Sequence, residues 1–113
     1  MTTCIFCRIA AGQQPAAIVY RDEDILAFRD NAPQAPTHIL VIPIRHIASL
    51  AELTDSDRDP AGRLISLAAR IAGENGLQAG YRLVINTGRQ GGQSVDHLHV
   101  HVLGGRQMKW PPG

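Results

Sequence analysis

Several short apolar-rich runs, separated by polar or proline-containing turns, recur along the chain, which is the pattern of β-strands. Residues 17–21 and 25–29 flank the acidic triplet 22–24 and predict a β-hairpin. Residues 38–42 (HILVI) predict a strand that ends at Pro43, because proline cannot donate to a sheet ladder. These runs predict that the first half of the chain is mainly β-structure.

The second half predicts two further strands, and the start of the chain predicts a short helix. Residues 81–86 and 95–103 have the strand pattern, whereas residues 30–37 hold two prolines and predict a loop. Residues 4–11 predict a helix that ends at Gly12, since glycine commonly ends helices.

One longer helix is expected between the two sets of strands. Asp59 and Pro60 predict its start, with a capping carboxylate and a proline in the first turn. The pair 75–76 (Asn-Gly) predicts its end. Its buried face carries apolar residues at helical spacing, namely Leu64, Leu67, Ala68 and Ile71. Together the elements predict one α+β domain over residues 1–113, with a mainly antiparallel sheet of about five strands.

Composition narrows the function classes. The chain has 113 residues and a formal net charge of +1, so no basic field favours a polynucleotide partner. No apolar run approaches the roughly 20 residues that span a bilayer, and the N-terminus lacks a secretory pattern. We therefore expect a cytoplasmic protein without a membrane partner, in which Cys4 and Cys7 stay reduced.

Three of the five histidines lie in one segment, residues 91–105 (GGQSVDHLHVHVLGG). Side chains alternate along a strand, so His97, His99 and His101 are predicted to share one face. Such a cluster suits either a metal site or nucleophilic and acid–base chemistry at phosphorus, and the spacing alone leaves both open. The preceding turn, 91–94, offers backbone N–H groups that can hold phosphate oxygens.

The segment 97–104 (HLHVHVLG) resembles the signature of the histidine triad (HIT) family, in which histidines alternate with apolar residues. Residues 30–43 and 91–113 are also similar to its Hint branch, the histidine triad nucleotide-binding proteins. His101 agrees with that branch, because the dinucleoside polyphosphate hydrolases typically have glutamine there. The resemblance covers essentially the whole chain and implies a single HIT domain with a HIT-like fold.

The resemblance implies a role for each matching residue. His99 matches the nucleophile that forms a nucleotidyl-histidine intermediate, and His101 matches the partner that holds the α-phosphate. His38 matches the residue that orders the histidines, and Ser94 lies near the departing atom. The remaining residues that the resemblance assigns to nucleotide binding are Phe6, Ile9, Phe28, Asp30, Asn31, Asn86, Gly92, Gln93 and Trp110.

The implied reaction is hydrolysis of the P–N bond of purine nucleoside 5′-phosphoramidates, which releases the nucleoside monophosphate and an amine. The alternatives are a dinucleoside polyphosphate hydrolase, a nucleotidyl transferase and a non-enzymatic nucleotide-binding scaffold. Asn31 stands where the family has an apolar residue, and Asp96 where an aromatic is frequent, so the preferred base is left open.

The pair Cys4 and Cys7 has the spacing of two thiolate zinc ligands, although two thiols are by themselves also typical of a helix core. Some members of the family bind structural zinc through two such cysteines, the histidine after the proline of the third strand, and the first triad histidine. The resemblance therefore implies zinc at Cys4, Cys7, His46 and His97, with reduced thiols and no metal as the alternative. The implied chemistry requires no catalytic metal.

The resemblance also implies a homodimer. The long helix and the strand near Tyr81 would meet their two-fold mates, and Trp110 would approach the active site of the other subunit. The alternative is that the apolar residues of that helix face only the core of their own chain.

Overall fold

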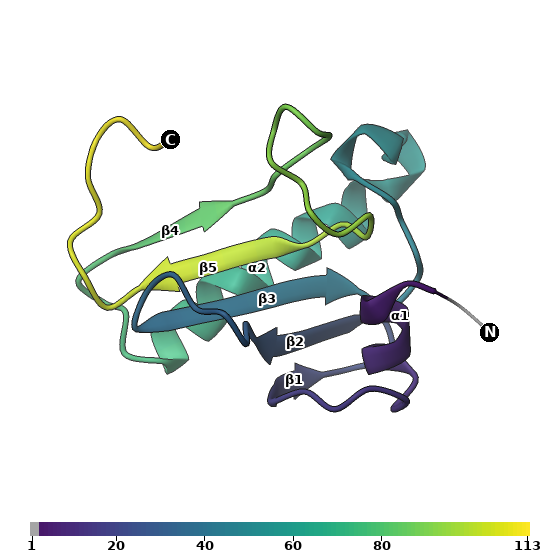
Figure 1. The fold of residues 1–113 in the computed structure, drawn as a ribbon, viewed down its shortest axis with the longest axis horizontal. Helices are drawn as coiled ribbons and strands as arrows, with labels where there is room; N and C mark the ends of the chain where they lie inside the picture. The colour runs from purple at the N-terminus through teal and green to yellow at the C-terminus, as the bar shows by residue number, and fades with distance from the viewer. Residues whose placement is uncertain (1–2) are drawn as a thin grey trace.

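The computed structural model describes residues 3–113. Five strands form one antiparallel sheet in the order β1-β2-β3-β5-β4 (Figure 1). The strands are β1 (Ile18–Arg21), β2 (Ile25–Arg29), β3 (Thr37–Pro43), β4 (Tyr81–Val84) and β5 (Val100–Gly104). The helices are α1 (Ile5–Ala10) and α2 (Arg58–Glu74), with short 3-10 turns at Leu50–Glu52 and Asp55–Asp57. The predicted α+β fold class is confirmed.

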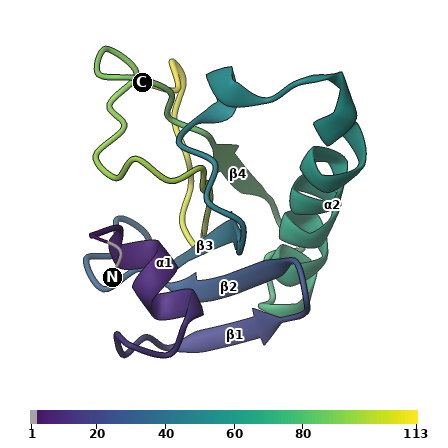
Figure 2. The same ribbon diagram turned by 90° about the vertical axis from the view of Figure 1, so that its right-hand side faces the viewer.

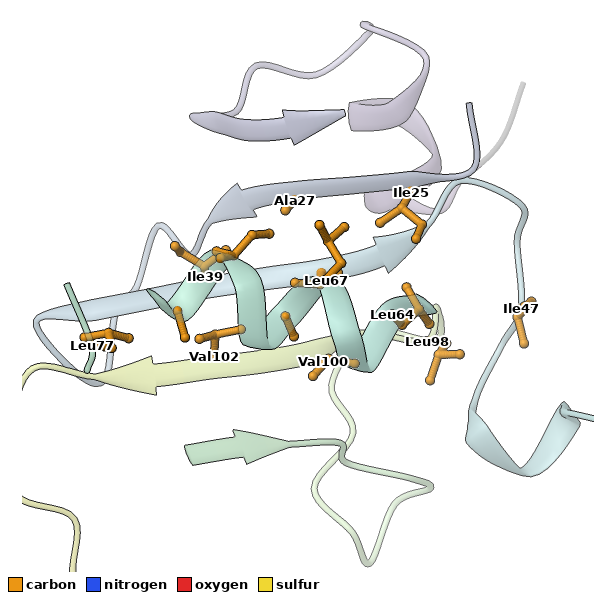
Figure 3. Close-up of a cluster of buried hydrophobic side chains, with 14 residues drawn as sticks. Ile25, Ala27, Ile39, Ile47, Leu64, Leu67, Leu77, Leu98, Val100 and Val102 are labelled. Carbon is orange, nitrogen blue, oxygen red and sulfur yellow. The ribbon is translucent and has the colours of Figure 1, made fainter. Parts of the chain in front are cut away.

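The two α-helices cover opposite faces of the sheet (Figure 2). The α2 face holds the larger core, in which Leu67 of the helix lies among sheet residues and Leu64 lies beside Leu98 (Figure 3). The face under α1 holds a smaller cluster that includes Phe6, Ile9, Leu26, Phe28, Leu40 and Ile42. Alternate residues of β3 therefore enter different cores, as the period of two requires.

The predicted boundaries need three corrections. The last strand begins at Val100 and not at residue 95, because the preceding residues pair with a loop: the Leu98 amide donates to the Ile47 carbonyl at 2.7 Å. Strand β4 ends at Val84, two residues before the predicted end. Helix α2 begins at Arg58, since a capping box between Thr54 and Asp57 starts a helical turn before Asp59.

The apolar face of α2 belongs to the core of its own chain. Its predicted buried residues are all at most 8% exposed, which assigns their apolar surface to the monomer: Leu64, Leu67, Ala68 and Ile71. The predicted contact of this helix with a two-fold mate is therefore left to its exposed side, and the homodimer stays a prediction. Ile65 and Tyr81 are the neighbouring apolar residues that stay exposed, at 43% and 41%. Within residues 3–113, no helix is long and apolar enough to cross a membrane.

Candidate active site

A cavity of about 400 Å³ lies on the α1 face of the sheet. Its floor follows the strand register, in which His101 on β5 is opposite Leu40 on β3, and Leu40 is opposite Phe28 on β2. Phe6 and Ile9 of α1 form part of its wall, and Phe6 meets Phe28 edge-on with ring centroids 5.3 Å apart. The remaining lining residues are Ile5, Gln14, Pro15, Ala16, Ala17, Arg29, Asp30, Asn31, Ser94, Val95 and His99.

Another hollow of about 540 Å³ lies between the end of α2, β4 and the segment 105–108. It contains none of the five histidines, and its two arginines are already bonded to backbone carbonyls: Arg82 to Lys109 at 2.7 Å and Arg106 to Gln34 at 3.1 Å. The 400 Å³ cavity is therefore the candidate active site, because side chains that can act as nucleophile, proton donor or acceptor line it: His99, His101, Ser94 and Asp30.

The protonation of the His99 ring follows from its backbone partner. The Nδ1 atom lies 2.7 Å from the carbonyl oxygen of His97, and a carbonyl only accepts. Nδ1 must therefore carry the proton and donate it to this bond. In the neutral ring the lone pair then resides on Nε2, which is the tautomer that can attack an electrophile.

A second chain of hydrogen bonds determines the tautomer of His101. The backbone amide of Gln34 donates to Nδ1 of His38 at 3.0 Å, so the proton of neutral His38 is on Nε2. That atom lies 2.8 Å from Nδ1 of His101 and 3.4 Å from a carboxylate oxygen of Asp30. Because His38 donates from Nε2, His101 accepts at Nδ1 and carries its own proton on Nε2.

Burial lowers the pKa of both His38 and His101 and so keeps these two rings uncharged near neutral pH. It is the main cause that lowers the pKa of His101 from 6.5 to about 4, and the neighbouring His99 and His38 lower it further. Burial also lowers the pKa of His38, although the Asp30 carboxylate opposes this shift. The rings of His99 and His101 are in edge contact, with centroids 4.8 Å apart. The site thus places a nitrogen lone pair beside a neutral N–H donor.

The predicted zinc ligands converge at the start of α1. All four ligand atoms lie within 4.8 Å of one another, although they come from three separate segments: Cys4, Cys7, His46 and His97. Nδ1 of His97 is 3.4 Å from Sγ of Cys4, and Nδ1 of His46 is 3.3 Å from Sγ of Cys7. Tetrahedral ligands at roughly 2.0–2.3 Å from zinc lie about 3.5 Å apart, so the spacing fits the ion.

The His97 ring is also in the correct tautomer for a metal. Its Nε2 lies 2.7 Å from the carbonyl oxygen of Pro43, so Nε2 donates and the lone pair of Nδ1 faces the thiols. Burial lowers the pKa of this ring, which keeps it neutral and able to act as a ligand.

A second group of possible ligands, Asp30, His38 and His101, fits a metal poorly. The atom of His38 that faces the group is Nε2, which carries the proton because the Gln34 amide occupies Nδ1. A metal at Nε2 would require the opposite tautomer and would leave two N–H groups pointing at each other. The hydrogen bonds therefore indicate that these three residues fix the position of the ring protons and do not bind a metal.

A sequence profile of the HIT domain matches residues 11–108. The chain belongs to the HIT domain family. It is similar to the 14 kDa zinc-binding protein of Zea mays, with 50% identity over 111 residues, which cover 96% of this chain and 87% of that protein.

Solved structures of HIT proteins have the same fold. A HIT family hydrolase from Legionella pneumophila is 51% identical and superimposes with a TM-score of 0.96 over 98% of this chain and 100% of its own. A histidine triad nucleotide-binding protein from Candida albicans is 29% identical, with a TM-score of 0.82 over 96% of this chain and 83% of its own. The predicted resemblance to the HIT family is thereby confirmed, and the Hint branch stays a prediction.

Four residues that the sequence placed at the nucleotide lie outside the lining of this HIT cavity: Asn86, Gly92, Gln93 and Trp110. The Gln93 amide donates to the carbonyls of Ala48 and Val95, and its oxygen accepts from the Gly88 amide, so this side chain braces the loop. Asn86 donates to the Gly91 carbonyl at 2.8 Å. Trp110 is 84% exposed near the end of the chain.

Three further residues of the site, two in the cavity lining and one that bonds to His38, were not predicted from the sequence. Leu40 alternates with His38 in the HILVI run and could have been found, because residues two apart share a face. The Gln34 amide and the side chain of Gln14 lie in irregular segments, where no periodic pattern indicates direction.

Proposed function

We propose that this HIT protein hydrolyses the P–N bond of purine nucleoside 5′-phosphoramidates and releases a nucleoside monophosphate and an amine. The observation that carries the proposal is the pair of opposite tautomers in one cavity, a lone pair on Nε2 of His99 beside an N–H on Nε2 of His101. The solved relatives include a HIT family hydrolase and a nucleotide-binding protein, which supports the choice of reaction class.

In the proposed complex, each part of the nucleotide meets a chemically suited part of the cavity. The base packs against the apolar wall that Phe6 and Phe28 form together, and the ribose hydroxyls donate to Asp30. The phosphoryl oxygens accept from His101, whose neutral ring donates without introducing a positive charge.

The first chemical step forms a bond between Nε2 of His99 and the α-phosphorus, while the P–N bond breaks. The departing nitrogen takes a proton from solvent through the Ser94 hydroxyl, which lies at the exposed side of the cavity. The positive charge that develops on the His99 ring is stabilised at Nδ1–H by the His97 carbonyl. Water then attacks phosphorus and releases one proton to solvent, the bond to Nε2 breaks and returns its electron pair to His99, and the nucleoside monophosphate leaves.

Turnover of a nucleoside 5′-phosphoramidate that carries a fluorescent amine tests the proposal. We expect His99→Ala to lower kcat by several orders of magnitude while the fold is kept, as for other catalytic nucleophiles. Ser94→Ala should lower turnover of poor leaving groups, whereas the control Ser66→Ala, on α2 at the opposite face, should leave it unchanged. Near-normal turnover by His99→Ala would refute the assigned nucleophile.

The same assay separates the alternatives. Faster cleavage of a dinucleoside polyphosphate than of the phosphoramidate would replace the proposed substrate class. Nucleotide binding without turnover of either compound would indicate a scaffold. A burst of released amine, with nucleotide retained on His99, would support the covalent route.

We further propose that Cys4, Cys7, His46 and His97 hold one structural zinc ion. When bound, zinc cross-links the start of the chain to the segments that follow β3 and precede β5. It takes no part in the reaction, because His97 presents its ring to the thiols and only its backbone carbonyl to His99.

We also propose a homodimer through the exposed side of α2 and the edge strand β4, where Ile65 and Tyr81 present apolar surface. The C-terminal segment is held to β4 by the bond from Arg82 to the Lys109 carbonyl, and Trp110 beyond it is free to contact a second subunit. Deletion of residues 108–113 should leave a dimer with altered preference among amines. A monomer at micromolar concentration by light scattering would refute the dimer, and unchanged amine preference would refute the role of Trp110.

A further inference from the structure

The side chain of Gln14 lies at the end of the cavity that is farthest from the catalytic histidines. The residues that face one another across the sheet form a row, His101, Leu40 and Phe28, which continues to Ile18 on β1. Strand β1 is the edge strand at the opposite side of the sheet from β4 (Figure 1). Gln14 and residues 15–17 immediately precede Ile18 and line the cavity there. A nucleotide whose phosphate meets His101 at the other end of this row would therefore direct its base toward Gln14.

The Gln14 amide has one forced orientation. Nη2 of Arg8 lies 3.1 Å from Oε1 of Gln14, and arginine has only donors, so the amide oxygen must face Arg8. The loop is held in place by a second bond, from the Gln13 amide to the Arg8 carbonyl at 2.8 Å. Since the bond from Arg8 holds the oxygen on one side of the amide, the two N–H donors on its other side are left for a molecule in the cavity.

We propose that Gln14 selects the base, favouring 6-oxopurine nucleotides (guanine or hypoxanthine) over adenine nucleotides. This inference rests on the proposed function for the position of the phosphate. The rest of the base end is lined by apolar side chains, such as Ile5, Ile9 and Phe28, which stack on either base without distinguishing them.

The discrimination follows from the donors and acceptors of the two bases. Guanine presents two adjacent acceptors, O6 and N7, whereas adenine presents the N6 amino donor beside N7. The Gln14 amino group can donate to the first edge but meets a second donor at the N6 position of adenine. For the oxygen to take the place of the amino group and accept from N6, the amide would have to rotate and turn its own N–H groups toward Arg8. Rejection of the wrong base therefore comes from an unpaired donor as well as from a lost bond.

Asn31 offers a control for this reasoning, because it is a second carboxamide in the same cavity lining. It is exposed, and among the described residues no hydrogen bond fixes its side chain. An amide that is free to rotate can donate or accept, so Asn31 should not distinguish the two bases.

The test is the Kd of GMP, IMP and AMP, measured by calorimetry on the wild-type protein and on variants. One net hydrogen bond corresponds to about a fivefold difference, so GMP and IMP should bind at least about fivefold tighter than AMP. Gln14→Leu should abolish this ratio, while Asn31→Leu should keep it. Gln14→Glu should reverse it, since a carboxylate held by Arg8 has a second oxygen that accepts from N6 of adenine.

The outcomes distinguish this inference from the proposed function. Equal or tighter binding of AMP by the wild type, or an unchanged ratio in a folded Gln14→Leu variant, would overturn the role of Gln14. The GMP preference in a protein that does not cleave phosphoramidates would support Gln14 and refute the proposed reaction. Absence of binding by all three nucleotides would overturn both.

Discussion

The neutral state of His101 makes the stability of the fold depend on pH in a way that one substitution can isolate. Burial lowers the pKa of this ring in the native state, whereas in the unfolded chain it returns to its ordinary value. As the pH falls through this interval, the unfolded chain binds a proton that the native protein excludes. His101 therefore destabilises the native state in acid, and His101→Gln should remove that contribution.

The size of the effect follows from the two pKa values. The native pKa is about 4 and the ordinary value is 6.5. At about 1.4 kcal/mol per pKa unit, the native state loses about 3 kcal/mol between pH 7 and pH 4 relative to a chain without this ring. The loss begins near pH 6.5 and levels off below the native pKa. A few kcal/mol is a large part of the stability of a domain of this size.

Urea unfolding of both proteins at half-unit steps from pH 7 to pH 4 measures this difference. Titrating groups that do not contact His101, including the cysteine–histidine cluster, are present in both proteins, so their contributions largely cancel when the two curves are subtracted. We expect the free energy of unfolding of the wild type to fall by about 3 kcal/mol more than that of His101→Gln. Parallel curves would show that the native ring takes up its proton normally, and the assigned neutral N–H donor would then be wrong.

Three further predictions concern the metal cluster and the glycines. Protein purified without chelator should contain about one zinc per chain by metal analysis. The double variant Cys4→Ser with Cys7→Ser should have a lower Tm and a lower affinity for GMP, because the short helix that carries these cysteines also forms the cavity wall. Calorimetry measures both quantities, and an unchanged Tm would contradict the zinc site. Gly91→Ala should destabilise the protein and disturb the loop before Ser94, since a Cβ there would lie 2.3 Å from the Thr87 carbonyl oxygen; an unaltered Tm would refute this contact. Gly62→Ala is the matched control in α2, where a Cβ meets nothing within 4 Å, and it should raise stability by about 0.5–1 kcal/mol; a fall in Tm would contradict the open space.

The sequence by itself determined the fold class and the grouping of the imidazoles. A period of two places Leu98, Val100 and Val102 in the core and the alternating histidines on the other side, and this holds even where the ladder has not yet begun. Local turn and capping residues likewise located the hairpin and both helices to within a few positions.

Only the tertiary structure decided which nitrogen of each ring carries a proton. Two of the partners that set these tautomers are distant in sequence, the Pro43 carbonyl 54 residues from His97 and His38, which lies 63 residues from His101. The other two, the His97 carbonyl and the Gln34 backbone amide, are two and four residues from their rings, but the irregular backbone that presents them has no periodic pattern. The same holds for Cys4 and His97, which lie 93 residues apart and meet only when the sheet and α1 have assembled. The direction of the Gln14 amide depends on Arg8 across a turn whose path periodicity does not indicate. Sequence periodicity determines which face a side chain occupies, whereas the atoms that it meets there are determined by packing between distant segments.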